Sequence, residues 1–193
     1  MPRLPRAFFA RPTLVVAREL LGQRLVCLRN GRRLSGLIAE AEAYIGENDL
    51  ACHARVGRTP RNEVMYGPPG YAYVYFTYGL HWMLNCVTER DGFPAAVLLR
   101  VIVPDGGVEI MRRLRGQAPE ARLANGPAKL TQALGIDGEL DGHDLCARGA
   151  KLFIERAALP PDSRIIARPR VGLGDTPEPW KSKAWNFRWL ISD

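Results

Sequence analysis

The hydrophobic pattern of this chain is that of short strands with a few helices between them. Over Thr13–Leu21 the apolar residues recur at helical spacing, which predicts a helix that ends at Gly22. Arg24–Arg29 is typical of a strand, and the pair Asn30-Gly31 that follows it is a strong signal for a two-residue hairpin. We therefore expect a return strand over about Arg33–Tyr44.

The return strand has two faces of different character, because successive side chains of a strand point in opposite directions. The alternation places Leu37, Ala39, Ala41 and Ala43 on one face, and Ile38, Glu40, Glu42 and Tyr44 on the other. The first set consists mostly of small residues, as expected for a face that packs closely. The second set brings two carboxylates and a phenol to the same side.

Strand patterns also outnumber helical ones in the rest of the chain. Strands are expected over Tyr71–Thr77, His81–Thr88, Ala95–Val103, Lys151–Glu155 and Arg164–Ala167, and helices over Val108–Arg115 and Pro127–Leu134. The first three of these strands form an antiparallel meander. Strands that run together, with helices outside the sheet, indicate an α+β fold. The Pro- and Trp-rich tail from Thr176 to Asp193 predicts no clear element.

Composition and charge narrow the class of protein. The 193 residues are 47% hydrophobic and 24% charged, which is typical of a globular domain and not of a disordered chain. Lysine and arginine number 27 against 20 acidic residues, the net charge is +7, and 23 of the 27 cations are arginine. Because guanidinium groups bind phosphate bidentately, this excess favours a polyanionic partner such as nucleic acid, with a merely arginine-rich composition as the alternative.

The first residues and the cysteines favour a cytoplasmic protein. Met1–Ala10 lacks the apolar core of a secretory signal, and no apolar run reaches the ~20 residues that a membrane span needs. The four cysteines form no C-x-x-C pair and lie at no zinc-binding spacing from a histidine; they are Cys27, Cys52, Cys86 and Cys146. We expect reduced thiols, no metal and, because glycine-rich nucleotide motifs are absent, no cofactor.

Glu40 and Glu42 are the first candidates for chemistry. Two carboxylates two residues apart on a strand lie on one face, about 7 Å apart by strand rise. This arrangement can serve general acid and base catalysis, and Tyr44 would share the same space. The alternative is a pair of glutamates on a solvated face, which spacing alone favours.

Aromatic residues concentrate around the reversal Tyr78-Gly79-Leu80. Most of them are expected in the core, but a tyrosine beside a glycine at a hairpin tip should be exposed. An exposed aromatic side chain of a basic protein can enter the space between base pairs. The alternative for Tyr78 is a turn residue that folds back on its own hairpin.

Two segments have the composition of phosphate-binding sites. The loop His53–Asn62 carries Arg55, Arg58 and Arg61 among small residues, which suits a loop that follows a phosphate backbone as well as it suits a solvated basic loop. Asn125–Lys129 predicts a helix start with a nearby lysine, which is an anion site or an ordinary cap.

Three longer stretches match a known family, and they are Ala39–Gly46, the loop His53–Asn62 and Gly70–Gly79. Shorter matches are Phe8-Phe9, Leu20–Gly22, Asn85, Leu98–Arg100, Gly126–Leu130 and Arg170–Gly174. In this order, over nearly the whole chain, these segments resemble the alkyladenine (3-methyladenine) DNA glycosylase family. The chain lacks the motif of the helix-hairpin-helix class of 3-methyladenine glycosylases.

The resemblance implies a fold and a reaction. The fold is one domain over residues 1–193, with a curved, largely antiparallel sheet, helices packed outside it and a protruding β-hairpin. The reaction is base excision by a monomer on double-stranded DNA: a damaged purine is flipped out, and water hydrolyses its glycosidic bond without strand cleavage. 3-Methyladenine and 7-methylguanine are the expected bases. Release of neutral hypoxanthine or ethenoadenine stays open, because these bases must be protonated to leave.

By position, the resemblance also implies catalytic roles. Glu42 would be the general base that activates the water, and Arg100 and the backbone carbonyl of Val171 would hold that water. Spacing alone does not separate Glu42 from Glu40.

The implied binding residues fall into three sets. The pocket for the flipped base would be lined by Tyr44, Ala51, His53 and Tyr75, and Asn85 would crowd the amino group of normal guanine. Tyr78 would fill the gap in the duplex, with Leu80 beside it. Phosphates would be met by Arg58, Arg61, Gly126 and Lys129.

Two other functions remain open from the residues. A non-catalytic nucleic-acid-binding protein of the same fold would have no need of a carboxylate beside a tyrosine-lined pocket. A carbohydrate hydrolase using Glu40 and Glu42 is compatible with their spacing, because retaining glycosidases place two carboxyl groups about 5 to 5.5 Å apart. Neutral sugars, however, give no reason for 23 arginines.

Overall fold

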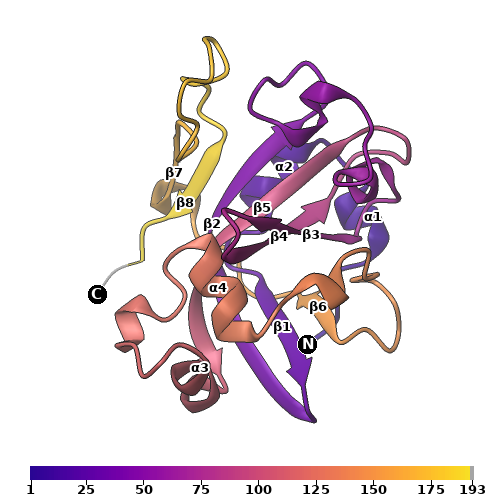
Figure 1. The fold of residues 1–193 in the computed structure, drawn as a ribbon. Helices are drawn as coiled ribbons and strands as arrows, with labels where there is room; N and C mark the ends of the chain where they lie inside the picture. Colours follow the sequence, from indigo (N-terminus) through magenta and orange to yellow (C-terminus); the bar gives the residue numbers. More distant parts are fainter. Residues whose placement is uncertain (192–193) are drawn as a thin grey trace.

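The computed structural model describes residues 1–191, in which eight strands form one sheet (Figure 1). The strands are β1 (Arg24–Arg29), β2 (Arg32–Ile45), β3 (Ala72–Thr77), β4 (His81–Val87), β5 (Ala95–Gly106), β6 (Leu152–Glu155), β7 (Ile165–Arg168) and β8 (Asn186–Trp189). The helices are α1 (Arg6–Phe9), α2 (Thr13–Glu19), α3 (Val108–Leu114) and α4 (Pro127–Leu134). Single 3₁₀ turns are η1 (His53–Val56), η2 (Glu63–Tyr66), η3 (Glu120–Arg122), η4 (Gly138–Leu140) and η5 (Asp162–Arg164).

The sheet is antiparallel, with the strand order β3-β4-β5-β2-β1-β6. Strand β8 joins β2 at Glu40–Glu42, beyond the end of β1, and β7 pairs with β8. The long strand β2 therefore has β5 along one side and, on its other side, first β1 and then β8 (Figure 1). This arrangement confirms the α+β class.

The two predicted hairpins form where their turn residues allow them. Asn30 and Gly31 both have left-handed backbone angles, with φ of 48° and 70°, which a tight turn between twisted antiparallel strands requires. Tyr78 and Gly79 do the same, with φ of 53° and 66°, at the tip between β3 and β4. Only glycine adopts this region without cost, so Asn30 and Tyr78 are held there by the strands that they join.

The alternation expected along β2 is interrupted by a β-bulge. Ile38 pairs with Ile102 and Glu40 with Val101, so that Ala39 has no partner on β5; Arg100 is then skipped before Ala41. Because a bulge changes which side successive residues face, Ile38 packs in the main core with Ala41 and Ala43. The expectation that Ile38 shares the face of the two glutamates is therefore wrong.

The two faces of the sheet carry different clusters of buried side chains. One face packs against α2 and α4 and forms the main core, to which β3 gives Ala72 and Val74. The other face is covered by the segment between β2 and β3, and Tyr73 belongs to its smaller cluster together with Cys52 and Met65. The candidate site residues of β2 to β5 lie on this second face.

The tail contains an element that its sequence does not predict. Asn186–Trp189 forms β8 and extends the sheet beside β2, although proline and tryptophan obscure any strand pattern before it. Ser192 and Asp193, the last residues of the tail, lie outside the described part. Within residues 1–191, no helix is both long enough and apolar enough to cross a membrane, and the four cysteines are free thiols.

Candidate active site

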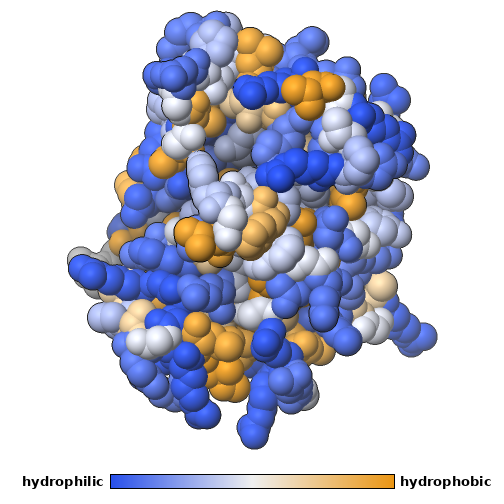
Figure 2. Space-filling model, viewed as in Figure 1, coloured by the Kyte–Doolittle hydropathy of each residue, from blue (hydrophilic) through white to orange (hydrophobic). Residues whose placement is uncertain are grey.

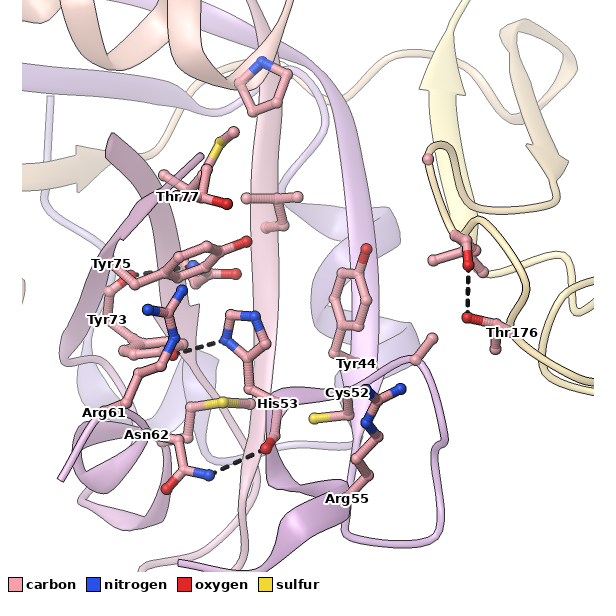
Figure 3. Close-up of a pocket in the computed structure, with 18 of the residues that line it drawn as sticks. Tyr44, Cys52, His53, Arg55, Arg61, Asn62, Tyr73, Tyr75, Thr77 and Thr176 are labelled. Carbon is pink, nitrogen blue, oxygen red and sulfur yellow. Dashed lines mark hydrogen bonds between the residues drawn. The ribbon is translucent and has the colours of Figure 1, made fainter. Parts of the chain in front are cut away.

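A cavity of about 520 Å³ opens on the second face of the sheet. Its walls come from the strands β2 to β5 with the tip between β3 and β4, the segment between β2 and β3, the first residue of α4, and the loop after β7. Figure 3 shows Tyr44 from β2 on one side and Tyr73 and Tyr75 from β3 on the other, with His53 between them in this view. Thr176 marks the loop after β7. The volume is that of a small-molecule pocket and is large enough for a purine.

Glu42 lies directly behind the wall of this cavity, and its side chain is fully buried. Oε2 accepts hydrogen bonds from the Tyr44 hydroxyl at 3.0 Å and from Arg100 at 3.1 Å. Oε1 accepts from the backbone N–H of Val171 at 2.7 Å and from Asn186 at 2.8 Å. These four bonds match the four lone-pair directions of a carboxylate, so its orientation is fixed. The donors Tyr44, Arg100 and Val171 all line the cavity, although Glu42 itself does not.

Glu40 has a different environment and does not line the cavity. It accepts from Arg100 Nε at 2.8 Å and from Asn186 at 2.9 Å, and Arg168 lies 3.2 Å away. Burial raises the pKa of Glu40, but the hydrogen bond from Asn186 and the charge of Arg100 outweigh it, and the net pKa lies below the usual value. Glu40 is therefore an ionised counter-ion at neutral pH.

Tyr44 remains a neutral hydrogen-bond donor. Burial raises its pKa well above the usual value, and the negative charge of Glu42 raises it further. Because the phenol keeps its proton, it can donate to Glu42 without competing for the role of base. Behind its ring lies the guanidinium of Arg170, whose central carbon is 4.6 Å from the ring centroid.

The opposite wall is built from aromatic rings. His53 Nδ1 lies 2.8 Å from the Tyr73 hydroxyl, and its ring meets that of Tyr75 edge to face with centroids 4.4 Å apart. Burial lowers the pKa of His53 to about 4, with smaller effects from the charges of Arg61 and Arg55. The imidazole is thus neutral at pH 7. Burial also raises the pKa of Tyr75 to about 12, so this wall carries no titrating group near neutrality.

Asn85 forms part of the cavity floor on β4, opposite Tyr73 in the sheet register. Its side chain is buried, and its amide nitrogen donates to the backbone carbonyl of Tyr73 at 3.0 Å. This bond fixes the direction of the amide. Ala51, another expected pocket residue, also lines the cavity.

The basic loop approaches the cavity with some of its arginines. Arg61 lines the cavity, donates to the carbonyl of Phe76 at 2.9 Å and lies over the Tyr75 ring. Arg58 lies outside the cavity lining and forms an exposed pair with Glu63. Buried Asn62 supports the loop by donating to the carbonyls of His53 and Gly57.

The hairpin tip and the start of α4 lie near the mouth of the cavity. The tip residues are strongly exposed, Tyr78 by 83% and Leu80 by 74%, and Tyr78 also contributes to the cavity lining. Gly126 precedes α4, whose first residue lines the cavity, and Lys129 donates to Asn125 at 2.9 Å. The surface seen in Figure 2 is largely hydrophilic, with small separate groups of hydrophobic side chains.

Comparison with known families identifies the chain. The model of the methylpurine-DNA glycosylase family matches residues 7–193, which is almost the entire sequence. The chain belongs to the methylpurine-DNA glycosylase family. As a member it is a DNA glycosylase, an enzyme of the hydrolase class that acts in DNA repair.

Several relatives resemble this glycosylase over most of their length. A protein of Methanocella arvoryzae is 50% identical over 186 residues, which cover 94% of this chain and 92% of the relative. One of Carboxydothermus hydrogenoformans is 50% identical over 170 residues, covering 88% of each chain. One of Chlorobaculum parvum is 46% identical over 183 residues, covering 94% and 87%. The names of all three assign them provisionally as 3-methyladenine DNA glycosylases.

The candidate site also contains residues that sequence reasoning did not single out. Asn186, from the tail, donates the same side-chain nitrogen to Glu40 and to Glu42. Asp49 and Arg170 form a fully buried ion pair behind Tyr44. Only the family resemblance marks the stretch Arg170–Gly174, and nothing in local spacing connects Asp49 with it. Such contacts between distant segments have no local signal.

Proposed function

We propose that this glycosylase excises alkylated purines from duplex DNA, with Glu42 as the general base. The observation that carries the proposal is that three donors to Glu42 line the cavity: Tyr44, Arg100 and the Val171 N–H. Only these donor groups therefore separate the carboxylate from a nucleobase bound in the cavity. A protein that only bound DNA would gain nothing from burying it there.

Oε2 is the oxygen of Glu42 that best suits proton transfer. Both of its donors, Tyr44 and Arg100, line the cavity and make the two longest of the four hydrogen bonds. If one of them turns aside, a water molecule can take its place. It can then give a proton to Oε2 while its oxygen attacks C1′ of the sugar and the bond from C1′ to the purine nitrogen breaks. We assign Arg100 and the Val171 carbonyl to holding that water.

Glu40 supports this chemistry without taking part in it. Its carboxylate is bound by Arg100 and Asn186 and does not line the cavity. A carbohydrate hydrolase would need both carboxylates at the reacting bond. The geometry therefore favours a single base and a water nucleophile, and the product is an abasic site in an intact strand.

The cavity suits a cationic purine. A base must leave the helix to enter it, and the gap can be filled by Tyr78 at the exposed tip. Tyr44, His53 and Tyr75 would enclose the base, and each electron-rich tyrosine ring attracts a cation by about 0.5 to 2 kcal/mol. Methylation at a ring nitrogen makes adenine or guanine such a cation, so 3-methyladenine and 7-methylguanine are the favoured substrates.

Asn85 would exclude normal guanine by crowding the amino group of that base, because the Asn85 side chain is fixed in the cavity by the Tyr73 carbonyl.

Phosphates around the opening of the cavity would be bound by four residues, which are Arg58, Arg61, Gly126 and Lys129. Arg58 must first exchange its contact with Glu63. We expect a monomer that acts where the chromosome lies, in the cytoplasm of a bacterial-type cell, and needs no metal.

The test uses purified protein and methylated duplex DNA in a buffer that contains a metal chelator. We expect release of free 3-methyladenine by the wild type, and loss of release with retained duplex binding for Glu42→Gln. Glu40→Gln is the matched control, in which some release should persist. If Glu42→Gln released bases as fast as the wild type, the assignment of the base would be wrong, and an inactive wild type would overturn the proposed reaction.

A further inference from the structure

We infer that Arg170 is a positioning residue, which together with Asp49 holds the Val171 N–H against Glu42 and supports the ring of Tyr44. This inference rests on the proposed function, because it concerns the base assigned there. It gives a role to the loop after β7 and to the tail, which the catalytic residues alone leave unexplained.

The contact between Asp49 and Arg170 is a two-pronged ion pair. Nη1 and Nη2 of Arg170 lie 2.5 Å and 2.9 Å from the two carboxylate oxygens of Asp49, and both side chains are fully buried. Arg170 also donates to the backbone carbonyl of Ala43, which is on β2 beside Glu42. The guanidinium thus bonds directly to β2, the strand that carries Glu42, the proposed general base.

Asp49 is itself fixed at the start of the segment that forms one wall of the cavity. Its carboxylate accepts from the backbone N–H of Ile45 at 3.3 Å and from that of Ala51 at 3.1 Å. Ala51, Cys52 and His53 follow and line the cavity. On the other side of the pair, Arg170 directly precedes the cavity-lining residues 171–173. The ion pair therefore links two wall segments of the cavity, residues 51–53 and residues 171–173.

The planar guanidinium also lies between two aromatic rings. Its central carbon is 4.6 Å from the centroid of Tyr44 and 5.0 Å from that of Trp185. Trp185 in turn contacts Lys183, which lies against Trp180. The tail thus supports the cavity wall through alternating aromatic and cationic groups, and the strand β8 that follows supplies Asn186 to Glu42.

Stability alone is a weak explanation for this arrangement. Burying two charges costs desolvation energy that their attraction recovers only in part, and apolar residues of similar volume are often as stable. Arg170 Nε adds a further cost, since it is the one buried side-chain nitrogen or oxygen in residues 1–191 that has no hydrogen-bond partner. What the pair does provide is a fixed direction for the backbone at Val171, whose N–H bonds to Glu42 at 2.7 Å.

The experiment compares Arg170→Lys with the wild type in single-turnover release of 7-methylguanine from methylated duplex between pH 5 and 8. Lysine keeps the positive charge but loses the two-pronged contact and the planar stack. A misplaced Val171 removes a hydrogen bond that favours the ionised form of Glu42. We expect the acid limb of the rate profile to move to higher pH and the rate at pH 7 to fall about 10- to 100-fold. Binding of a duplex with a tetrahydrofuran abasic-site analogue should stay within about twofold.

Arg33→Lys is the matched control. Arg33 forms another two-pronged pair, with Glu155, and neither residue lines the cavity. This variant can lose stability, but its acid limb should coincide with that of the wild type. Should Arg170→Lys fail to fold, Asp49→Asn is the second variant, because it keeps the shape and weakens the pair; its acid limb should also move to higher pH.

Three results would overturn the inference. One is an unchanged rate and profile in Arg170→Lys or, where that variant does not fold, in Asp49→Asn. Another is a slower variant whose acid limb stays in place, since this is what a merely structural role predicts. The third is a wild type that releases no base, which removes the proposed function and this inference with it, whereas the first two leave the proposed function intact.

Discussion

The rings of His53 and Tyr75 meet edge to face in the wall of the cavity, with centroids 4.4 Å apart. This contact keeps the imidazole out of water, and burial lowers its pKa to about 4. A histidine in a glycosylase cavity suggests a general acid, but this one is unprotonated at pH 7. Its expected role is to shape the pocket and to offer a neutral hydrogen-bonding edge.

The lowered pKa of His53 makes stability depend on pH. Between pH 4 and about 6.5 the unfolded chain binds a proton that the folded protein does not, so stability is lost as the pH falls through this window. The gap between these two pKa values corresponds to about 3 kcal/mol. In His53→Gln this contribution disappears, and urea midpoints at pH 4.5 and 7.5 should differ less than in the wild type.

His81→Gln is the control for this measurement, because His81 is exposed at the start of β4. Its midpoints should follow those of the wild type at both pH values. Equal pH dependence in wild type and His53→Gln would show that the imidazole is already protonated in the folded protein at pH 4.5.

Tyr78 combines an exposed side chain with a backbone conformation that tyrosine does not favour. An exposed ring gains no stability from burial, so we expect Tyr78 to act in binding DNA. In Tyr78→Ala we expect about tenfold slower release from a damaged duplex, because nothing fills the gap left by the flipped base, and little change on a damaged single strand. Parallel single-turnover assays on the two substrates measure the ratio of the release rates from duplex and from single strand.

Tyr78→Gly separates this role from folding. Glycine accepts a φ of 53° without strain, so the thermal midpoint should hold or rise, by an amount corresponding to at most about 1 kcal/mol. A more stable variant with impaired duplex activity would support the role in DNA. Equal losses on duplex and single strand would contradict it.

Asn85 is expected to limit the range of bases. Its amide is held by the Tyr73 carbonyl and cannot easily move away from an incoming guanine. In Asn85→Ser the smaller side chain leaves space for the guanine amino group, so release of normal guanine from undamaged duplex should rise about tenfold. Chromatography of free bases after long incubation measures this. If guanine release did not rise while 3-methyladenine release stayed intact, residues other than Asn85 would be responsible for excluding guanine.

Lys129 should contribute to the salt dependence of DNA binding. If it neutralises one phosphate, the slope of log affinity against log salt should be less steep by about 0.9 in Lys129→Ala. Fluorescence titrations of undamaged duplex at several salt concentrations give the slope. Lys151→Ala is the comparison, since this exposed lysine precedes β6 and does not line the cavity. Identical slopes for Lys129→Ala and the wild type would remove Lys129 from the interface.

Local patterns were sufficient for most of the sheet. The hairpin at Asn30-Gly31, the aromatic strand β3 and the helix that begins at Pro127 follow from turn residues, alternation and helix-start signals. Each of these signals acts between residues a few positions apart, where backbone geometry and side-chain direction are set. The same patterns placed Glu42 beside Tyr44, and the hydrogen bond of 3.0 Å between them confirms that proximity.

Tertiary structure alone decided which of the two glutamates accepts hydrogen bonds from Tyr44 and Val171. The bulge at Ala39 changes the side on which Ile38 lies, and strand alternation contains no sign of it. Arg100, Val171 and Asn186 reach Glu42 from 58, 129 and 144 residues away in sequence. Such contacts depend on how strands pair and loops close, and a carboxylate acquires its environment only when those distant donors have been brought together.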